Sequence, residues 1–257
     1  MSEAATEKGG VKCQVANKIG RIEFHHPQSN SLPGDVLAEL AESITEMGQR
    51  EDVAVIILSS SGEKAFCAGA SFDELSSISD LEEGKKFFSG FANVINACRK
   101  CPKIIIGRVQ GKAVGGGVGL ASAVDYCLAA SGASVKLSEL AVGIGPFVVG
   151  PAVERKMGLS AMSQLAINAT EWRSADWARD NGLYADVFDN IAQLDEAVEI
   201  LADKLSRSNP EALAGLKRVF WEGTESWDDL LKERAAISGR LVLSDFTRNA
   251  IAAFKAR

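Results

Sequence analysis

Hydrophobic and polar residues alternate in two short runs near the start of the chain. The runs are Val11–Val15 and Ile19–Phe24, with Asn17-Lys18 between them. A period of two is typical of half-buried strands, and a short polar connection between two such runs is typical of a hairpin. We therefore expect the chain to begin with two antiparallel strands.

The spacing of apolar residues changes to that of a helix after Pro33. One apolar stripe consists of Val36, Leu37, Leu40, Ile44 and Met47. A second amphipathic segment runs from Leu81 to about Cys98, with Phe87, Phe88, Phe91, Val94 and Ile95 on its inner side. Such stripes predict helices that bury one face against a core.

Continuous apolar runs indicate further strands. Val53–Leu58 and Ile104–Ile106 read as buried strands, and Tyr126–Ala129 and Val135–Leu137 as shorter ones. After Gly150 the pattern becomes almost wholly helical. Residues at helical spacing there include Leu194, Ala197, Val198, Leu201 and Leu205. Taken alone, this alternation of strands and helices favours a doubly wound parallel sheet.

Composition restricts the classes of function. The 257 residues are 46% hydrophobic and 24% charged, close to the globular average, and suffice for one domain or two. A formal net charge of −6 argues against nucleic acid as a partner. No apolar run approaches the roughly 20 residues that span a membrane. The polar stretch Met1–Gly10 lacks a signal-peptide core, so we expect a cytoplasmic protein without membrane partners.

The chain has five cysteines, at positions 13, 67, 98, 101 and 127. Their odd number and irregular spacing favour reduced thiols. Cys98 and Cys101 form a C-x-x-C pattern, which a redox site would also show. A helix that ends before Pro102 explains this pattern more simply.

Two glycine-rich stretches and one glutamate suggest chemistry. The first stretch is Phe66–Ala70 and the second is Gly115–Gly117, while Glu139 lies between apolar runs. Glycine lets a backbone approach a ligand closely, and a helix that starts at the triple glycine would add its N-terminal partial charge. Together the two turns could aim two N–H groups at one oxygen, with a carboxylate nearby to move protons.

At these residues the sequence resembles the crotonase superfamily of enoyl-CoA hydratases and isomerases. The family's three motifs correspond to Phe66–Ser71, Gly111–Leu120 and Ser138–Pro146, in the same order and spacing. The resemblance implies an α/β fold: a spiral of β-β-α turns over residues 1–195, followed by a C-terminal helical region, 196–257. That region would cap the core or pack on a neighbouring subunit. A homotrimer or a dimer of trimers is implied.

The resemblance also implies roles for the motif residues. The N–H groups of Ala70 and Gly116 would hold the thioester oxygen, with Gly69 and Gly115 shaping the two turns. Glu139 would be the acid–base carboxylate, and burial among apolar neighbours would raise its pKa. A dinucleotide loop is the rival interpretation of the glycines, but Leu120 stands where its third glycine would be.

Contacts to coenzyme A are implied at less specific positions. The backbone of Phe66 and Ala68 would contact adenine, and His26 would meet phosphate. Phe254 and Arg257 would close the pocket, often from the next subunit. Each has a simpler interpretation: His26 as part of a turn, Phe254 as a core aromatic residue, and Arg257 as part of a solvated tail. His25 and His26 lack further ligands, so we expect neither a metal nor a cofactor beyond the coenzyme A of the substrate.

Two departures from the family pattern leave the activity open. Gly119 replaces the second carboxylate of two-glutamate hydratases, and Ser71 replaces the usual Asp. Glu139 would then be the only acid–base residue, and Gly119 could make room for a branched acyl group. We favour reversible hydration of a 2-enoyl-CoA, with Δ3,Δ2-enoyl-CoA isomerisation as the alternative. A non-catalytic acyl-CoA-binding protein would lack the carboxylate, and a serine hydrolase would need a G-x-S-x-G elbow, which is absent.

Overall fold

A hairpin opens the fold, as the alternating pattern predicts. The computed structural model describes residues 9–255, and its strands β1 (Gly10–Ala16) and β2 (Ile19–His25) pair antiparallel. Asn17 and Lys18 both have positive φ, 53° and 62°. Two successive left-handed residues form the hairpin turn whose twist matches that of the strands.

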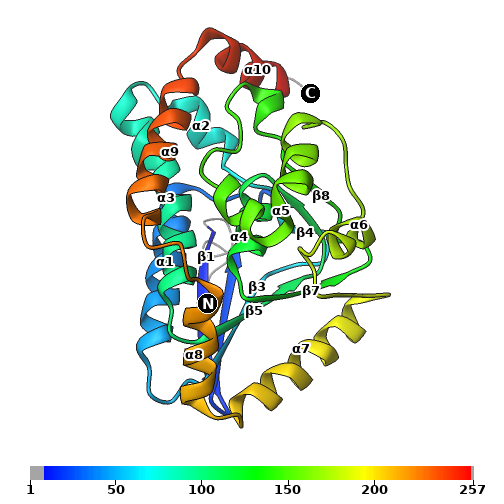
Figure 1. The fold of residues 1–257 in the computed structure, drawn as a ribbon. Coiled ribbons are helices and arrows are strands. Elements are labelled where there is room, and N and C mark those ends of the chain that lie inside the picture. Colours follow the sequence, from blue (N-terminus) through cyan, green and yellow to red (C-terminus); the bar gives the residue numbers. More distant parts are fainter. Residues whose placement is uncertain (1–8, 256–257) are drawn as a thin grey trace, which may run out of the picture.

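The remaining strands are parallel and alternate between two sheets (Figure 1). One sheet has the order β1-β2-β3-β5-β7-β9 and the other β4-β6-β8. The larger sheet is completed by β3 (Val55–Ser60), β5 (Ile104–Val109), β7 (Tyr126–Ala130) and β9 (Asp186–Phe188). The smaller sheet contains β4 (Ala65–Cys67), β6 (Lys112–Val114) and β8 (Val135–Lys136). From β3 to β8 the chain passes from one sheet to the other at each strand, which makes the fold a spiral and not one doubly wound sheet.

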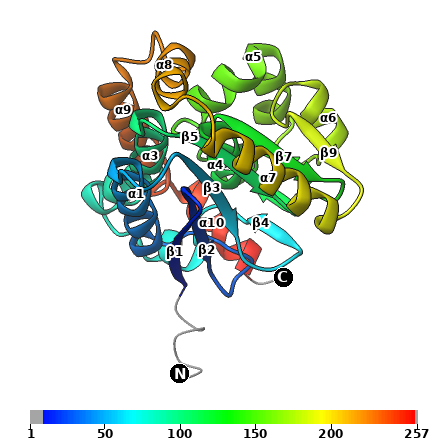
Figure 2. The same cartoon turned by 90° about the horizontal axis from the view of Figure 1, so that it is seen from below.

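Three helices form a layer on one side of the sheets: α1 (Gly34–Gln49), α3 (Leu81–Lys100) and α9 (Trp227–Leu241) (Figures 1 and 2). The apolar stripes predicted for α1 and α3 are buried in the main core. On the other side, α7 (Ile191–Ser206) covers the larger sheet with Leu194, Val198 and Ala202. Both faces of that sheet are therefore shielded from water, as its continuous apolar strands require.

Helices α3 and α9 meet through two glycines. A Cβ atom on Gly84 would lie 2.6 Å from the Gly239 carbonyl oxygen, and one on Gly239 would lie 2.5 Å from the Lys85 nitrogen. Any larger residue at either position would force the helices apart. This close approach sets the distance between α9 and α3.

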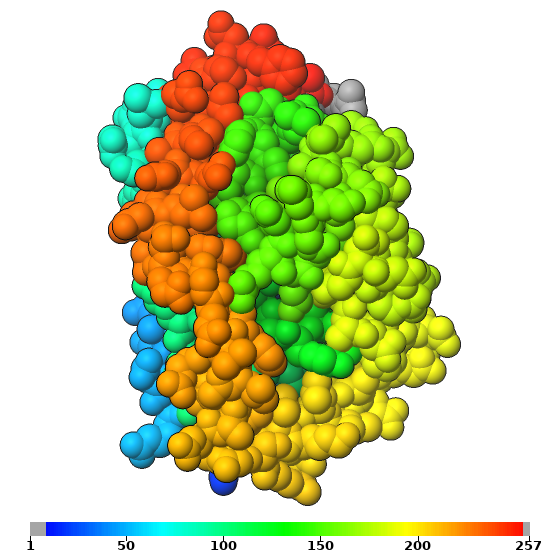
Figure 3. Space-filling model, viewed as in Figure 1, coloured from blue at the N-terminus to red at the C-terminus, as the bar shows by residue number. Residues whose placement is uncertain are grey.

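The chain from Gly150 onward is mostly helical, as predicted. It contains α5 (Gly150–Ile167), α6 (Ala175–Asp180), α8 (Pro210–Phe220) and α10 (Asp245–Lys255). On the face seen in Figure 3, the orange and red segment with α9 and α10 lies directly beside the green segment that follows β7. Within residues 9–255, no helix combines the length and apolarity needed to cross a membrane.

A buried ion pair attaches α8 to the core. Lys217 Nζ lies 2.6 Å from Asp125 Oδ2, and the two side chains are 3% and 2% exposed. Asp125 also accepts hydrogen bonds from the Trp221 indole, at 2.9 Å, and from the Ile105 N–H, at 2.8 Å. These partners compensate the cost of burying a carboxylate.

Some predicted boundaries need correction. The strand expected at Val53–Leu58 is β3, which starts two residues later because Ala54 still donates its N–H to Lys18 in the turn, and pairing with β2 begins at Val55. The strand expected at Val135–Leu137 ends at Lys136, although Leu137 is buried. The short strands β4, β6 and β9 are not among the predicted elements. The expected division between residues 195 and 196 falls inside α7.

The C-x-x-C pattern marks a helix end. Helix α3 stops at Lys100, and Cys101 forms its C-cap, immediately before Pro102. Cys98 and Cys101 are buried free thiols, and burial raises the pKa of Cys98 to about 12. A thiol with so high a pKa is a poor nucleophile and metal ligand at neutral pH.

Candidate active site

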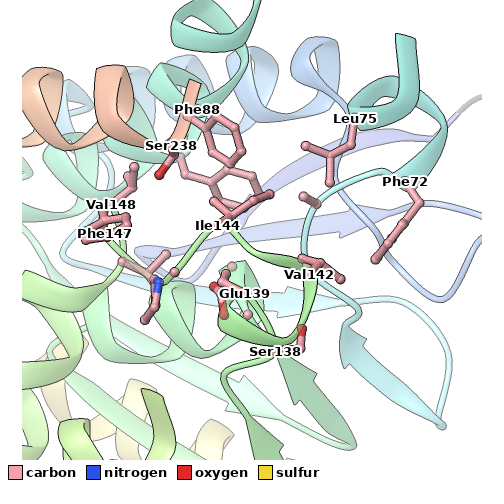
Figure 4. A pocket seen from close by; sticks show the side chains of 18 of the residues that line it. Phe72, Leu75, Phe88, Ser138, Glu139, Val142, Ile144, Phe147, Val148 and Ser238 are labelled. Carbon is pink, nitrogen blue, oxygen red and sulfur yellow. The ribbon is translucent and has the colours of Figure 1, made fainter. Parts of the chain in front are cut away.

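A pocket opens where β4, β6 and β8 end (Figure 4). The three parallel strands deliver the segments that follow them, 68–70, 115–116 and 138–139, to the same edge of the small sheet. Apolar side chains from other segments form most of the wall: Phe72, Leu75, Phe88, Phe91, Val142, Ile144, Phe147, Val148 and Val149.

The two glycine-rich turns are in backbone contact. Gly69 and Gly115 have positive φ values, 88° and 53°, which glycine adopts without strain. A Cβ atom on Gly69 would lie 2.9 Å from the Val114 oxygen and 3.5 Å from the Gly116 nitrogen. A Cβ on Gly117 would lie 2.5 Å from the Cys67 oxygen. Glycine at these positions is what allows the first turn to reach the start of α4 (Gly116–Ala123).

Two N–H groups at this junction have no acceptor within the described chain. Around the first turn, Ala68 N–H donates to Ser29 and Ser71 N–H to Leu32, but Ala70 N–H has no partner among residues 9–255. Gly116 is the first residue of α4, so its N–H lies before the helical ladder begins. Both residues line the pocket. Paired free donors, one of them at a helix N-terminus, suit an oxygen that gains negative charge.

Glu139 lies against the second turn. A Cβ atom on Gly115 would be 3.0 Å from Glu139 Oε1, so this carboxylate rests directly over the glycine. Its Oε2 is buried and has no hydrogen-bond partner among the described residues. Burial raises the pKa of Glu139 to about 7, partly opposed by a backbone hydrogen bond. A carboxyl with this pKa can both take up and release a proton at neutral pH.

The position of Glu139 follows from local structure. It precedes the short 3-10 helix η2 (Leu140–Val142), and its carbonyl accepts hydrogen bonds from Val142, at 3.2 Å, and Ile144, at 3.0 Å. Gly143, with a φ of 83°, ends this turn in the left-handed region. The tight turn holds the Glu139 side chain inside the pocket (Figure 4).

Gly119 faces a valine in this chain. A Cβ atom on Gly119 would lie 2.7 Å from the Cβ of Val149, which also lines the pocket. Val149 therefore fills the space that a longer side chain at position 119 would enter. Ser71 caps α2 (Phe72–Ser77), since its Oγ accepts the Glu74 N–H at 3.4 Å.

The structure brings together Glu139, Gly69, Ala70, Gly115 and Gly116, and Ala68 lines the same pocket. Three other residues expected to bind substrate, Phe66, His26 and Gly119, are not among the lining residues. The Phe66 side chain is 1% exposed and packs edge-on against Phe24 in the core. The contact expected of Phe66 is made by its backbone, so it stays a prediction.

His26 makes contacts away from the pocket. Its Nδ1 accepts the Gln28 N–H at 3.3 Å and lies 3.1 Å from Ser31 Oγ. Partial burial lowers the pKa of His26, which disfavours the charged form that would attract phosphate.

The substrate contacts expected of Phe254 and Arg257 cannot be compared with the described residues. Phe254 belongs to the last turn of α10, but its side chain is outside the described part, and Arg257 lies outside the described residues. Among residues 9–255, no three His, Cys, Asp or Glu side chains gather as a metal would require. The expectation of a metal-free site stays a prediction.

Some pocket residues were not identified from the sequence. Phe91 from α3, Val149 before α5 and Ser238 from α9 all line the pocket. Phe91 and Val149 have the spacing of ordinary core residues, and Ser238 is far from every motif. The only signal for Ser238 is its place beside Gly239 in an otherwise amphipathic helix.

Known proteins resemble this chain over most of its length. A sequence profile described as enoyl-CoA hydratase/isomerase matches residues 14–249. A peroxisomal Δ(3,5)-Δ(2,4)-dienoyl-CoA isomerase of Arabidopsis thaliana is 30% identical, covering 87% of this chain and 84% of that protein. A short-chain-enoyl-CoA hydratase of Clostridium acetobutylicum is 28% identical over 96% of this chain and 95% of its own length.

The fold itself matches solved structures. A crystal structure of an enoyl-CoA hydratase from Bacillus halodurans superposes with a TM-score of 0.86 at 20% identity, covering 95% of this chain and 99% of that one. This likeness shows the expected spiral of β-β-α turns with C-terminal helices.

Proposed function

Because the chain belongs to the enoyl-CoA hydratase/isomerase family, we propose that it hydrates a 2-enoyl-CoA reversibly, with Glu139 as its only acid–base residue. The observation that carries this proposal is the position of Glu139. Its unpartnered Oε2 faces a pocket that also contains the free N–H groups of Ala70 and Gly116.

In the proposed reaction, Glu139 takes a proton from water while the water oxygen bonds to C3 of the enoyl group. The C2–C3 π electrons move toward the thioester and leave an enolate. The enolate oxygen accepts hydrogen bonds from the N–H groups of Ala70 and Gly116. The carboxyl of Glu139 then gives its proton to C2, which completes the addition of water. A pKa near 7 suits both steps, because neither protonation state is strongly disfavoured at neutral pH.

Isomerisation is the second candidate, and one observation favours it. Val149 occupies the space beside Gly119, and among the described lining residues Glu139 is the only carboxylate that could hold a water molecule. A double-bond shift needs no water: Glu139 would take a proton from C2 of a 3-enoyl-CoA and return it at C4. The hydratase and isomerase named above, both relatives of this chain, are consistent with either candidate.

Substrate assays of the purified protein distinguish the two reactions. With crotonyl-CoA, a hydratase gives a 3-hydroxyacyl-CoA that incorporates heavy oxygen from labelled water. With 3-hexenoyl-CoA, an isomerase gives 2-hexenoyl-CoA without incorporating solvent oxygen. Turnover of 3-hexenoyl-CoA alone would contradict hydration, and binding without any turnover would favour a non-catalytic acyl-CoA-binding protein.

We also propose that the protein needs no metal or nicotinamide and assembles as a homotrimer or a dimer of trimers. Exposed apolar residues on α8 support the assembly, since Leu216, Val219 and Phe220 are 48%, 57% and 48% exposed. Activity should survive chelation with EDTA, and light scattering should give three or six times the monomer mass. A monomer at micromolar concentration would contradict the assembly.

A further inference from the structure

One hydroxyl group at the buried end of the pocket has no partner. Ser238 is 0% exposed, and its Oγ makes no hydrogen bond to any described residue. The side chain lines the same pocket as Glu139. A buried hydroxyl that lacks a partner is costly, so its retention in an apolar wall calls for an explanation.

Two other helical serines in this chain satisfy their hydroxyl groups locally. Ser89 donates to the Lys85 carbonyl at 2.7 Å, and Ser122 to the Val118 carbonyl at 2.8 Å. Both are bonds to the preceding turn, the usual way a serine is accommodated in a helix. Ser238 makes no such bond to its own helix, and its hydroxyl is turned into the pocket (Figure 4).

The surrounding structure fixes the position of this hydroxyl. Gly239, the next residue, is in backbone contact with Gly84, so α9 cannot move away from α3 without losing that contact. Phe88 and Val148 line the same pocket as Ser238 (Figure 4) and are 7% and 4% exposed. The Ser238 hydroxyl is therefore a fixed polar group in a mostly apolar pocket wall.

Burial differs among the lining residues. Ala68, Phe72, Val142 and Phe147 are partly exposed, whereas Ser238 is 0% exposed. A thioester held at the oxyanion donors from outside would send its acyl chain inward. The group that reaches Ser238 would then be the distal part of the acyl chain.

We propose that Ser238 hydrogen-bonds an uncharged oxygen, a hydroxyl or a carbonyl, on the distal part of the acyl chain. This inference rests on the proposed function, because it names the substrate class of the same site. A carboxylate fits less well, since no Lys, Arg or His is among the described lining residues and an unpaired buried charge is costly. Ser238 is thus a specificity-determining residue that selects oxygenated acyl-CoA esters.

Binding of saturated esters, which cannot turn over, tests this assignment. Calorimetry would compare hexanoyl-CoA with 6-hydroxyhexanoyl-CoA, and butanoyl-CoA with 4-hydroxybutanoyl-CoA, on the native protein, Ser238→Ala and Ser89→Ala. For at least one pair, Ser238→Ala should reduce the preference for the hydroxylated ester by about tenfold, as for one neutral hydrogen bond. Ser89→Ala is the matched control, because its hydroxyl is already satisfied within a helix.

The possible results separate the inference from the proposed function. Equal preference in the native protein and Ser238→Ala, while all esters bind, would overturn the role of Ser238 and leave the proposed function standing. Equal weakening of both members of each pair would indicate a merely structural role and also overturn it. No binding of any ester to the native protein would contradict the proposed function itself.

Discussion

Val149 packs directly against Gly119, where a Cβ atom would lie 2.7 Å from the valine Cβ. The space that a second carboxylate would need is therefore occupied by the side chain of a residue thirty positions later in the chain. Gly119→Glu alone should overpack the site and lower the free energy of unfolding by about 1–3 kcal/mol.

Shortening Val149 should allow Gly119→Glu to increase the rate of hydration. In the double variant Gly119→Glu/Val149→Ala, we expect faster hydration of crotonyl-CoA than in Val149→Ala alone, because a second carboxylate can hold the water. Gly119→Gln/Val149→Ala is the control of similar shape without the charge. Initial rates decide the matter, and equal rates in all three would contradict a water-holding role for a carboxylate here.

The oxyanion donor at Gly116 can be tested with a matched pair. The Phe91 ring lies over Gly116, with its Cζ 2.8 Å from where a Cβ would be, so the test uses a Phe91→Ala background. There Gly116→Ala keeps the N–H and Gly116→Pro removes it, and proline is tolerated at the first position of a helix. The proline variant should be slower by at least about 10²-fold. Similar turnover in both would rule out this donor.

Glu139→Gln should abolish turnover and leave acyl-CoA binding nearly unchanged, since the proposed oxygen-binding groups are backbone N–H groups. In the native enzyme, kcat/KM should fall about tenfold per pH unit below the Glu139 pKa of about 7, because the carboxylate starts the reaction. The measurements are a pH–rate profile and calorimetry with a saturated ester. Rates in Glu139→Gln that equal the native ones would refute the mechanism.

Glu139 should also make stability depend on pH. Its folded-state pKa, about 7, exceeds the ordinary value of 4.5, so the folded protein holds an extra proton between these values. This group's contribution is most favourable below pH 4.5 and is lost as pH rises through 7, at a cost of about 3 kcal/mol at most. Glu139→Gln should therefore stabilise the protein at pH 8 and have little effect at pH 5. Denaturant titrations at both values check this, and equal effects at both would contradict the raised pKa.

Breaking the Lys217–Asp125 pair should be costly, because both side chains are buried. Lys217→Met leaves a buried carboxylate uncompensated and should lower the free energy of unfolding by about 3–5 kcal/mol. Lys217→Met/Asp125→Asn should recover part of the loss. Arg207→Met, which breaks an exposed pair with Asp203, should cost at most about 0.5 kcal/mol in the same urea titrations. A loss for Lys217→Met no larger than for Arg207→Met would show that the buried pair is unimportant.

Sequence patterns predicted the elements whose periodicity is long. The stripes of α1 and α3 and the hairpin at Asn17-Lys18 follow from local rules, and so does the helix that begins at Gly116. Strands β4 and β6 were not predicted because each has only three residues, too few to show a period of two. They are stabilised by pairing with each other.

The same limit applies to the site. Motifs located Ala70, Gly116 and Glu139, since glycine and a lone carboxylate between apolar runs are visible locally. Val149 and Ser238 could not be found in this way. Their place in the pocket depends on tertiary packing, which periodicity does not encode. Val149 lies against Gly119, and Ser238 is next to Gly239, which contacts Gly84.

Backbone groups and side chains have separate roles in this pocket, and this separation affects how its substrate preference can change. The groups that we propose to hold the thioester oxygen are main-chain N–H groups, which most substitutions leave in position. The acyl pocket is lined by side chains from α3, α9 and the segment before α5, which contribute nothing to those donors. Under the proposed function, mutations at positions such as Val149 or Ser238 would change which acyl chain the pocket accepts and leave the backbone donors for the enolate oxygen in place.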